Sequence, residues 1–297
     1  MPKTYNELYI AARQTLREAG IEAFALEARL LLGLASGKLQ EELLRDLQLY
    51  ASTPIEQKLE ELCRRRAAGE PAAYLTGRWE FCGLELRVTS DTLVPRSDTE
   101  VLVEQALPLL RAPGEVQRVL DLGTGTGCIG LALAHFLPAV HVLLADKSPA
   151  ALAVARENTE RLGLSQQVDC LLLDVTEPPD PALGSFNMIV SNPPYIPSAE
   201  LAELDWSVRG YEPREALDGG PDGLRFYRAI LNHHLPLLRQ GGWLLFEVGE
   251  DQADAVLALM RRAGLLSLGT AQDSAGYARV VYGRKTEPIH TSSSRRT

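Results

Sequence analysis

The sequence predicts an α/β protein in which an N-terminal helical bundle is joined by a β-hairpin to a seven-stranded sheet. In the first 76 residues, apolar side chains recur at helical intervals. From Arg118 onward, strand-like and helix-like segments alternate, which predicts a parallel sheet with helices on both faces. The final two apolar runs, 266–271 and 277–282, are separated by a turn too short for a crossover, so we expect them to be antiparallel.

Length and composition set the broad class. The 297 residues are enough for roughly two domains. The formal net charge is −9, from 30 Lys and Arg against 39 Asp and Glu, which disfavours a general nucleic-acid binder. Neither a membrane-helix pattern nor a signal-peptide pattern is present, so we expect a cytoplasmic protein without a membrane partner. We also expect a monomer. The four cysteines lack CxxC spacing, and we expect neither disulfides nor a metal site.

The predicted N-terminal domain, residues 1–76, has recognisable helix ends. Thr4 and Glu7 have the spacing of a capping box, and Gly20 is placed to end the first helix. A later helix is expected to begin with Thr53 as its cap, followed by a first-turn proline. These signals predict several short helices packed together.

A change of period marks the predicted linker, residues 77–97. Apolar and polar residues alternate on both sides of Gly83, which predicts a β-hairpin. Ser97 and Glu100 then have cap-and-carboxylate spacing in front of an apolar stretch that begins at Val101. We therefore expect Ser97 to cap the first helix of the larger domain.

The larger domain is expected to span residues 98–285, with a polar, disordered tail at 286–297. Five apolar runs predict its parallel strands at 118–122, 141–145, 168–173, 186–191 and 243–248. The antiparallel ending distinguishes this sheet from the parallel sheet of a dinucleotide-binding domain.

A glycine-rich loop follows the first of these strands. Its residues are Gly123, Thr124, Gly125, Thr126 and Gly127. Glycine lets the backbone approach a ligand closely, and a loop at this edge of a parallel sheet lies beside the ligand crevice. Residues 125–130 also match GxGxxG, so a nicotinamide cofactor has to be considered, although the match begins one glycine late relative to the strand.

Asp146 ends the second strand, 23 residues after Gly123. At that spacing a carboxylate can accept hydrogen bonds from both hydroxyls of a ribose. The alternative is a helix cap, a role that Ser148 could fill equally well.

The segment 121–127 resembles the first motif of S-adenosylmethionine-dependent methyltransferases with a Rossmann-like sheet. In that resemblance the loop holds the methionine part of the cofactor. Asp174, at the end of the third strand, would contact the adenine amino group, and Val175 would lie beside the ring. The alternative for Asp174 is an ordinary turn aspartate.

Asn192, Pro193, Pro194 and Tyr195 follow the fourth strand and form a turn with little freedom. Two consecutive prolines remove two N–H donors, and the carbonyls then project as acceptors. If the Asn192 side-chain oxygen and the Pro193 carbonyl point the same way, they can hold a planar NH2 group on which Tyr195 stacks. Such acceptors raise the electron density of a nitrogen that attacks an electrophilic methyl. Glutamine amides and exocyclic base amines both fit this description.

The chain resembles the peptide chain release factor glutamine methyltransferases, the PrmC or HemK family, over residues 1–285. The motifs that carry the resemblance lie in order at 69–71, 74–77, 93–96, 98–100, 121–127, 191–197, 212–213, 216–220 and 222–224. Ser97 stands where the family usually has proline, and we expect little consequence because serine can cap the helix.

The resemblance implies methylation of the side-chain nitrogen, N5, of the glutamine in the Gly-Gly-Gln motif of class 1 release factors. S-adenosylmethionine would be the methyl donor, and the N-terminal bundle would dock the factor. The turn from Asn192 to Tyr195 would be catalytic and would bind the substrate, with Asn192 also touching the cofactor.

Other functions stay open at this point. An N6-adenine nucleic-acid methyltransferase would need a basic groove and usually a target-recognition insert. A glutamine methyltransferase of a ribosomal protein and a catalytically silent cofactor-binding protein are further alternatives, and a nicotinamide oxidoreductase is the least favoured.

Two more segments attract attention. Residues 196–223 are long for a structureless connection and predict a binding loop or lid, lined by Trp206 and Tyr211. The basic run from Arg64 to Arg66 indicates a solvated helix face rather than a docking patch.

Overall fold

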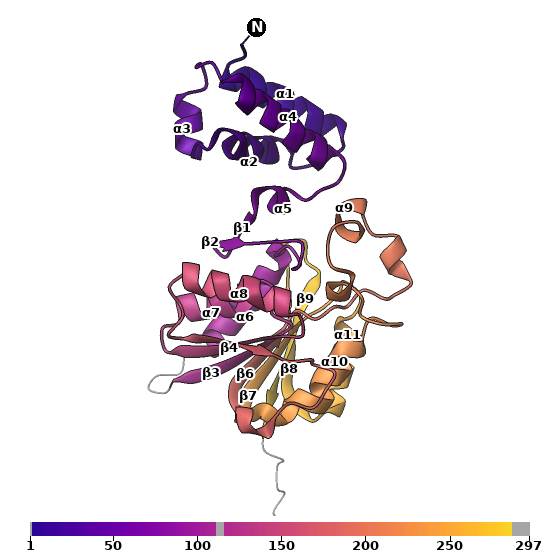
Figure 1. Ribbon diagram of the computed structural model, residues 1–297. Helices are drawn as coiled ribbons and strands as arrows, with labels where there is room; N and C mark the ends of the chain where they lie inside the picture. Colours follow the sequence, from indigo (N-terminus) through magenta and orange to yellow (C-terminus); the bar gives the residue numbers. More distant parts are fainter. Residues whose placement is uncertain (1, 111–115, 287–297) are drawn as a thin grey trace, which may run out of the picture.

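The computed structural model describes residues 2–110 and 116–286, and Figure 1 shows their arrangement. A helical bundle at the N-terminal end is followed by a small β-hairpin, which leads into a sheet with helices on both faces. The tail expected at 286–297 lies outside the described residues apart from Thr286. Within the described ranges, no helix is long and apolar enough to cross a bilayer, and no three His, Cys, Asp or Glu side chains gather as a metal site.

The N-terminal helices enclose their own core, which includes Leu16 and Leu31. They are α1 (Tyr5–Glu18), α2 (Phe24–Ser36), α3 (Gln40–Arg45), α4 (Thr53–Ala67) and α5 (Ala72–Thr76). The predicted capping box is confirmed, because Thr4 Oγ1 accepts from Glu7 N at 3.2 Å and Glu7 Oε2 accepts from Thr4 N at 2.7 Å. The prediction for α4 is wrong by one residue: Ser52, with extended backbone angles, holds the N-cap position.

The hairpin pairs β1 (Arg78–Phe81) with β2 (Leu84–Arg87). Its two turn residues, Cys82 and Gly83, both have positive φ angles, 49° and 74°. The Cys82 N–H donates to Glu100 Oε1 at 2.7 Å, so α6 (Ser97–Leu109) holds the hairpin turn. This contact corrects the expected cap: Glu100 is used by the hairpin, Arg96 takes the N-cap position, and Ser97 is the first residue inside the helix.

The main sheet has seven strands in the order β5-β4-β3-β6-β7-β9-β8. Its strands are β3 (Gln117–Leu122), β4 (Val140–Asp146), β5 (Val168–Leu172), β6 (Phe186–Ser191), β7 (Leu238–Glu247), β8 (Leu265–Gln272) and β9 (Ala278–Lys285). β9 is antiparallel to β8, as predicted, and it is also antiparallel to β7. The other pairs are parallel, as predicted. β7 begins five residues earlier than expected, because an irregular register opposite β6 carries it through Gly241 and Gly242. The sheet order reverses between β3 and β6, where ligands bind in such folds.

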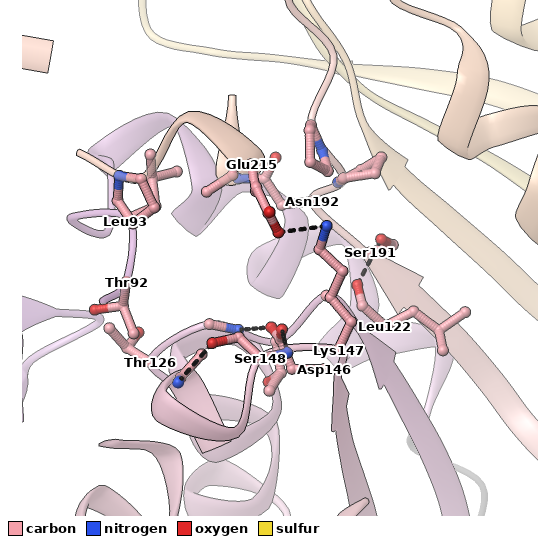
Figure 2. A pocket seen from close by; sticks show the side chains of 18 of the residues that line it. Thr92, Leu93, Leu122, Thr126, Asp146, Lys147, Ser148, Ser191, Asn192 and Glu215 are labelled. Carbon is pink, nitrogen blue, oxygen red and sulfur yellow. Dashed lines mark hydrogen bonds and ion pairs between the residues drawn. The ribbon is translucent and has the colours of Figure 1, made fainter. Parts of the chain in front are cut away.

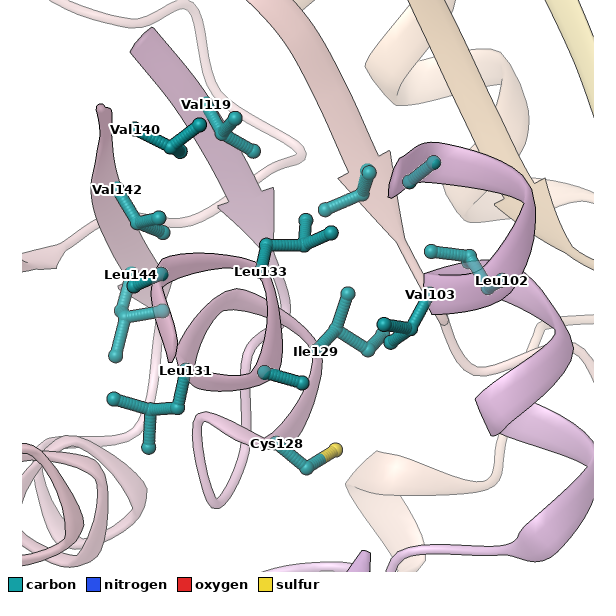
Figure 3. Packing of buried hydrophobic residues seen from close by; sticks show 14 of the residues in the cluster. Leu102, Val103, Val119, Cys128, Ile129, Leu131, Leu133, Val140, Val142 and Leu144 are labelled. Atoms are coloured by element: carbon teal, nitrogen blue, oxygen red, sulfur yellow. The ribbon is translucent and has the colours of Figure 1, made fainter. Parts of the chain in front are cut away.

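Helices cover both faces of this sheet. The helices after α6 are α7 (Cys128–Phe136), α8 (Pro149–Arg161), α9 (Trp206–Arg209), α10 (Arg225–Ala229) and α11 (Ala253–Arg262). On one face, Leu102 and Ile129 from α6 and α7 pack toward Val119 of β3 (Figure 3). On the other face, Tyr227 and Val256 from α10 and α11 belong to a second hydrophobic cluster, which is called the second core cluster below. Burial on both faces fixes the strands, and with them the loops at their carboxyl ends.

Candidate active site

A cavity of about 350 Å³ opens at the carboxyl ends of β3, β4 and β6 (Figure 2). The structure brings together on its walls nine of the residues predicted from the sequence: Gly123, Thr124, Gly125, Thr126, Asp146, Val175, Asn192, Pro193 and Pro194. Of the described residues, three that were predicted lie outside this lining: Gly127, Asp174 and Tyr195. The glycine loop and the proline turn therefore face one crevice, at the point where the strand order reverses.

The glycine loop has a fixed shape because a buried carboxylate lies beneath it. Asp121, fully buried on β3, accepts from Thr124 Oγ1 at 2.6 Å and from Gly130 N at 3.0 Å. Burial raises the pKa of Asp121 to about 6. Gly127 has φ of 86° and starts α7, and an added Cβ there would lie 2.8 Å from the Leu131 side chain. Gly127 thus shapes the loop from behind.

Asp146 stands at the end of β4 and points at the glycine loop. Its Oδ2 accepts from Gly125 N and its Oδ1 from Ser148 N, both at 2.9 Å. Ser148 is the N-cap of α8, with its hydroxyl oxygen accepting from Ala151 N at 3.2 Å. The capping role therefore belongs to Ser148, which leaves the Asp146 carboxylate on the pocket wall and favours a role in ligand binding.

Asp174 and Val175 follow β5 but have different surroundings. The exposed Asp174 carboxylate accepts from Thr176 N at 2.8 Å and from its hydroxyl at 2.7 Å. These hydrogen bonds lower the pKa of Asp174. Val175 lines the pocket, and its carbonyl oxygen lies 3.1 Å from Nε2 of the fully buried His234. His234 thereby holds the wall in place, and burial lowers its pKa.

The proline turn is held at both of its ends. Ser191 Oγ donates to the Leu122 carbonyl at 2.6 Å, so the ends of β6 and β3 are tied together. Asn192 Nδ2 donates to the hydroxyl oxygen of Thr99, on α6, at 3.2 Å. On the far side, a Cβ on Gly223 would lie 2.3 Å from the Tyr195 carbonyl oxygen. Only glycine allows this close approach of the following loop to the turn.

The Tyr195 ring lies behind the turn, where it packs against the second core cluster. Burial raises the pKa of its hydroxyl to about 12. The Tyr195 carbonyl accepts from Gln252 Nε2 at 2.8 Å. The stacking role predicted for Tyr195 stays a prediction.

Several residues that were not predicted to have a role in the site lie at the pocket or behind it. Arg96 forms an ion pair with the buried Glu212, and Glu212 Oε2 also accepts from Val94 N at 3.2 Å. Lys147 and Glu215 meet 2.6 Å apart between opposite sides of the pocket mouth (Figure 2). Glu247 lies at the end of β7. A charged residue at the carboxyl end of a buried strand is a sequence feature that indicates a ligand site, and it could have pointed to Glu247.

The segment 196–223 is ordered rather than structureless. It contains α9 and the short turns Glu200–Ala202 and Arg214–Ala216, and Ile196 bridges to Asp218. Trp206, 53% exposed, donates from Nε1 to the Ala68 carbonyl at 3.1 Å. The Trp206 ring meets the Tyr211 ring edge to face, with centroids 6.3 Å apart. This segment is thereby fastened to the end of α4.

The basic run on α4 is taken up by ion pairs. Arg64 pairs with Glu61 at 2.7 Å, and Arg65 pairs with Glu70 at 2.5 Å. Arg66 reaches the buried Glu27 on α2 at 2.5 Å, which links two helices of the bundle. Arg64 and Arg65 are exposed, as predicted for a solvated helix face, whereas Arg66 is half-buried between two helices.

The pocket suits S-adenosylmethionine in size and in chemistry. Its volume falls within the range of small-molecule sites. A Cβ added to Gly123 or Gly125 would meet nothing within 4 Å, so the loop offers open backbone to a ligand. The Asp146 carboxylate can accept from ribose hydroxyls, and the side chain of Val175 offers an apolar surface to a base.

Comparison with known proteins identifies the family. Residues 7–77 match the PrmC N-terminal domain, and residues 97–204 match the methyltransferase small domain. A release factor glutamine methyltransferase of Geobacter sulfurreducens is 46% identical, over 92% of this chain and 93% of its own length. Another, of Caulobacter vibrioides, is 40% identical over 96% of this chain and 98% of its own length.

Among solved structures, the hMettl16 catalytic domain in complex with the MAT2A 3'UTR hairpin 6 shares the fold. It is 17% identical, has a TM-score of 0.53, and the match covers 76% of this chain and 82% of that one. Identity at this level shows a common architecture only. The two curated relatives, in contrast, match almost from end to end, and the chain therefore belongs to the family of release factor glutamine methyltransferases.

Proposed function

We propose that this protein transfers a methyl group from S-adenosylmethionine to the side-chain nitrogen, N5, of the glutamine in the Gly-Gly-Gln motif of class 1 release factors. The observation that carries the proposal is the position of Asn192 on the pocket wall opposite the glycine loop. Its Nδ2 is engaged by Thr99, which leaves the oxygen end of the Asn192 amide for a ligand.

The amide nitrogen of glutamine is a weak nucleophile, so the enzyme has to increase its reactivity. The lone pair of an amide nitrogen is delocalised, and acceptors aimed at its N–H bonds increase the electron density on nitrogen. Asn192 Oδ1 and the Pro193 carbonyl are the two proposed acceptors, and Tyr195 is proposed to stack on the amide plane. When bound, S-adenosylmethionine supplies the methyl group on a positively charged sulfur. No side chain has to act as a strong base in this scheme.

We assign the cofactor to the β3 and β4 side of the pocket. The backbone from Gly123 to Gly127 would hold the methionine part, and Asp146 would hold the ribose. Asp174 and Val175 would contact the adenine, and Asn192 would touch both reactants. Support comes from the open backbone of the loop and from the position of Asp146 on the pocket wall.

The proposed partner is a class 1 release factor docked on the N-terminal bundle. The net charge of −9 disfavours the alternative substrate, adenine in DNA. Because one chain contains every proposed site residue, we infer a monomeric enzyme, and a substrate in translation termination would place it in the cytoplasm.

The test is incubation with methyl-labelled S-adenosylmethionine and three separate acceptors: a purified release factor, the same factor with its Gly-Gly-Gln glutamine changed to alanine, and DNA. We expect label in the unaltered factor alone. Label in DNA but in neither factor would favour the adenine alternative. Equal labelling of both factors would contradict the proposed target glutamine.

A further inference from the structure

Glu247 is a buried acid that the proposed mechanism does not use. It ends β7, is 1% exposed, and its Oε2 has no hydrogen-bond partner among the described residues. The sheet register pairs Ser191 with Phe246, so the next residues, Asn192 and Glu247, are neighbours at the carboxyl edge. A buried charge is costly unless something compensates for it, so this position calls for an explanation.

The groups around the Glu247 carboxyl come from five elements, one of which is α7 with the buried thiol of Cys128. Thr99 and Asp98 lie at the start of α6, Arg279 lies on β9, and Asn192 and Tyr195 belong to the turn after β6. From α10, Tyr227 Oη donates to the Glu247 main-chain carbonyl at 2.8 Å. Arg279 is shared with Asp273 at 2.9 Å and Asp98 at 3.2 Å.

Burial raises the pKa of Glu247 to about 7, against lowering contributions from the Thr99 hydroxyl, Arg279 and the Asn192 amide. Two of these groups, Thr99 and Asn192, are uncharged donors to this carboxyl group, and they hydrogen-bond to each other in the active site.

We propose that Glu247 is a positioning residue that sets, through Thr99, which end of the Asn192 amide faces the pocket. This role follows from the number of donors and acceptors on the three side chains, and it rests on the proposed role of Asn192. An amide can be reversed with little change of shape, and a hydroxyl can serve as donor or acceptor, so Thr99 alone does not choose the orientation.

A carboxylate, however, only accepts. Next to the ionised Glu247, the Thr99 hydroxyl donates its proton to the carboxylate. The Thr99 oxygen is then available to accept from Asn192 Nδ2, as observed at 3.2 Å. The Asn192 oxygen is directed to the opposite end, toward the pocket. Protonation of Glu247 gives it an O–H donor and removes this constraint, so turnover should fall as Glu247 takes up a proton.

The experiment measures kcat, KM for the release factor and the dissociation constant of S-adenosylmethionine across about pH 6 to 9. For Glu247→Gln we expect kcat to fall about tenfold at high pH, as for other lost outer partners of functional groups, with cofactor affinity unchanged. The wild-type kcat should rise with an apparent pKa near 7, and the variant should lack that rise. A variant with the wild-type kcat and pH profile would overturn the proposal.

Thr99 provides a second route to the same answer if Glu247→Gln folds poorly. Thr99→Val removes the hydroxyl at nearly constant shape and should lower kcat about tenfold, whereas Thr99→Ser restores the hydroxyl and should restore kcat. The double variant with Glu247→Gln should lose no more than the worse single variant. Additive losses, or equal losses for the serine and valine variants, would contradict a shared chain of hydrogen bonds.

The matched control is Thr159→Val on α8. Thr159 is also buried, but its hydroxyl donates to the Ala155 carbonyl of its own helix at 2.8 Å. We expect it to leave kcat and its pH profile unchanged. Asn192→Ala distinguishes the proposed function of Asn192 from the positioning role of Glu247. If Asn192→Ala keeps full turnover, the proposed role of Asn192 fails. If Asn192→Ala loses turnover while the Glu247 and Thr99 variants keep theirs, only the positioning role fails.

Discussion

The two walls of the pocket are each backed by a buried carboxyl group, but they are built from different kinds of sequence. Behind the glycine loop, Asp121 holds Thr124 and Gly130, both within nine positions along the chain. Behind the proline turn, Asn192 is held by Thr99, which is 93 positions away, and Glu247 comes from a third segment. The wall with the glycine loop, which is proposed to bind the cofactor and is called the cofactor wall below, is thus a local motif. The wall with the proline turn, which is proposed to bind the substrate amide and is called the substrate wall, exists only once the sheet has formed.

Burial raises the pKa of both acids, to about 6 for Asp121 and about 7 for Glu247. Each acid has one carboxyl oxygen without a hydrogen-bond partner within the described part of the chain, Oδ1 of Asp121 and Oε2 of Glu247. The other oxygen of Asp121, Oδ2, accepts from two close donors. Both walls of the pocket therefore rest on a buried acid that is incompletely compensated, as is common at functional sites.

The largest expected effect is on turnover when the substrate wall loses its acceptor. Asn192→Ala should lower kcat about 100- to 1,000-fold, because one aligned partner of the reacting group disappears. Cofactor affinity, measured by calorimetry, should stay within about twofold. Asn232→Ala, at an exposed position outside the pocket, is the control. A large loss of cofactor affinity instead would mean that Asn192 belongs mainly to the cofactor wall.

The next largest expected effect is on the pH dependence of the free energy of unfolding. The folded pKa of Glu247 is raised from 4.5 to about 7, so its contribution to folding is fully present below pH 4.5 and is lost as the pH rises toward 7. Because each pKa unit corresponds to about 1.4 kcal/mol, the loss of unfolding free energy is on the order of 3 kcal/mol. Denaturant unfolding should show Glu247→Gln gaining stability relative to wild type across this interval. A constant difference between pH 4.5 and 8 would count against the raised pKa.

On the cofactor wall we expect a smaller effect, confined to binding. Asp146→Ala should weaken S-adenosylmethionine binding about 10- to 100-fold through loss of hydrogen bonds to a charged acceptor. The kcat at saturating cofactor should change much less. Asp169→Ala, exposed on β5, should leave the affinity unchanged. A fall in kcat without a change in cofactor affinity would mean that Asp146 acts in turnover and not in cofactor binding.

The smallest expected effect lies in the segment next to the substrate wall. Trp206→Phe keeps an aromatic ring but removes the hydrogen bond to the Ala68 carbonyl, which should cost about 1 kcal/mol of unfolding free energy. If residues 196–223 position a docked factor, KM for the whole factor should rise by a few-fold, and KM for a short glutamine peptide should not. An equal rise for both acceptors would place the effect inside the pocket.

Sequence patterns predicted those parts of the fold that depend on neighbours along the chain. The capping box at Thr4 and the hairpin at Gly83 both follow from local spacing, and so does the antiparallel end of the sheet. The Ser97 cap failed because Glu100, its expected partner, is used by Cys82 of the hairpin. Local spacing carries no information about such a competing contact.

In the active site, too, local sequence patterns did not predict the contacts between residues far apart in the chain. Both motifs at the strand ends were visible, and the parallel sheet placed them in one crevice. Tyr195 and Asp174 were predicted to face the ligand, and their surroundings depend on the core cluster and on Thr176, which pattern alone does not reveal. Thr99 and Glu247 were missed, since their role requires the register between β6 and β7.

The contact between Trp206 and Ala68 limits how the protein can be recombined. It joins positions 138 residues apart, and a Cβ on the adjoining Gly69 would lie only 2.5 Å from the indole. A hybrid that took its bundle from one relative and its sheet from another would need both the glycine and the tryptophan to keep this contact.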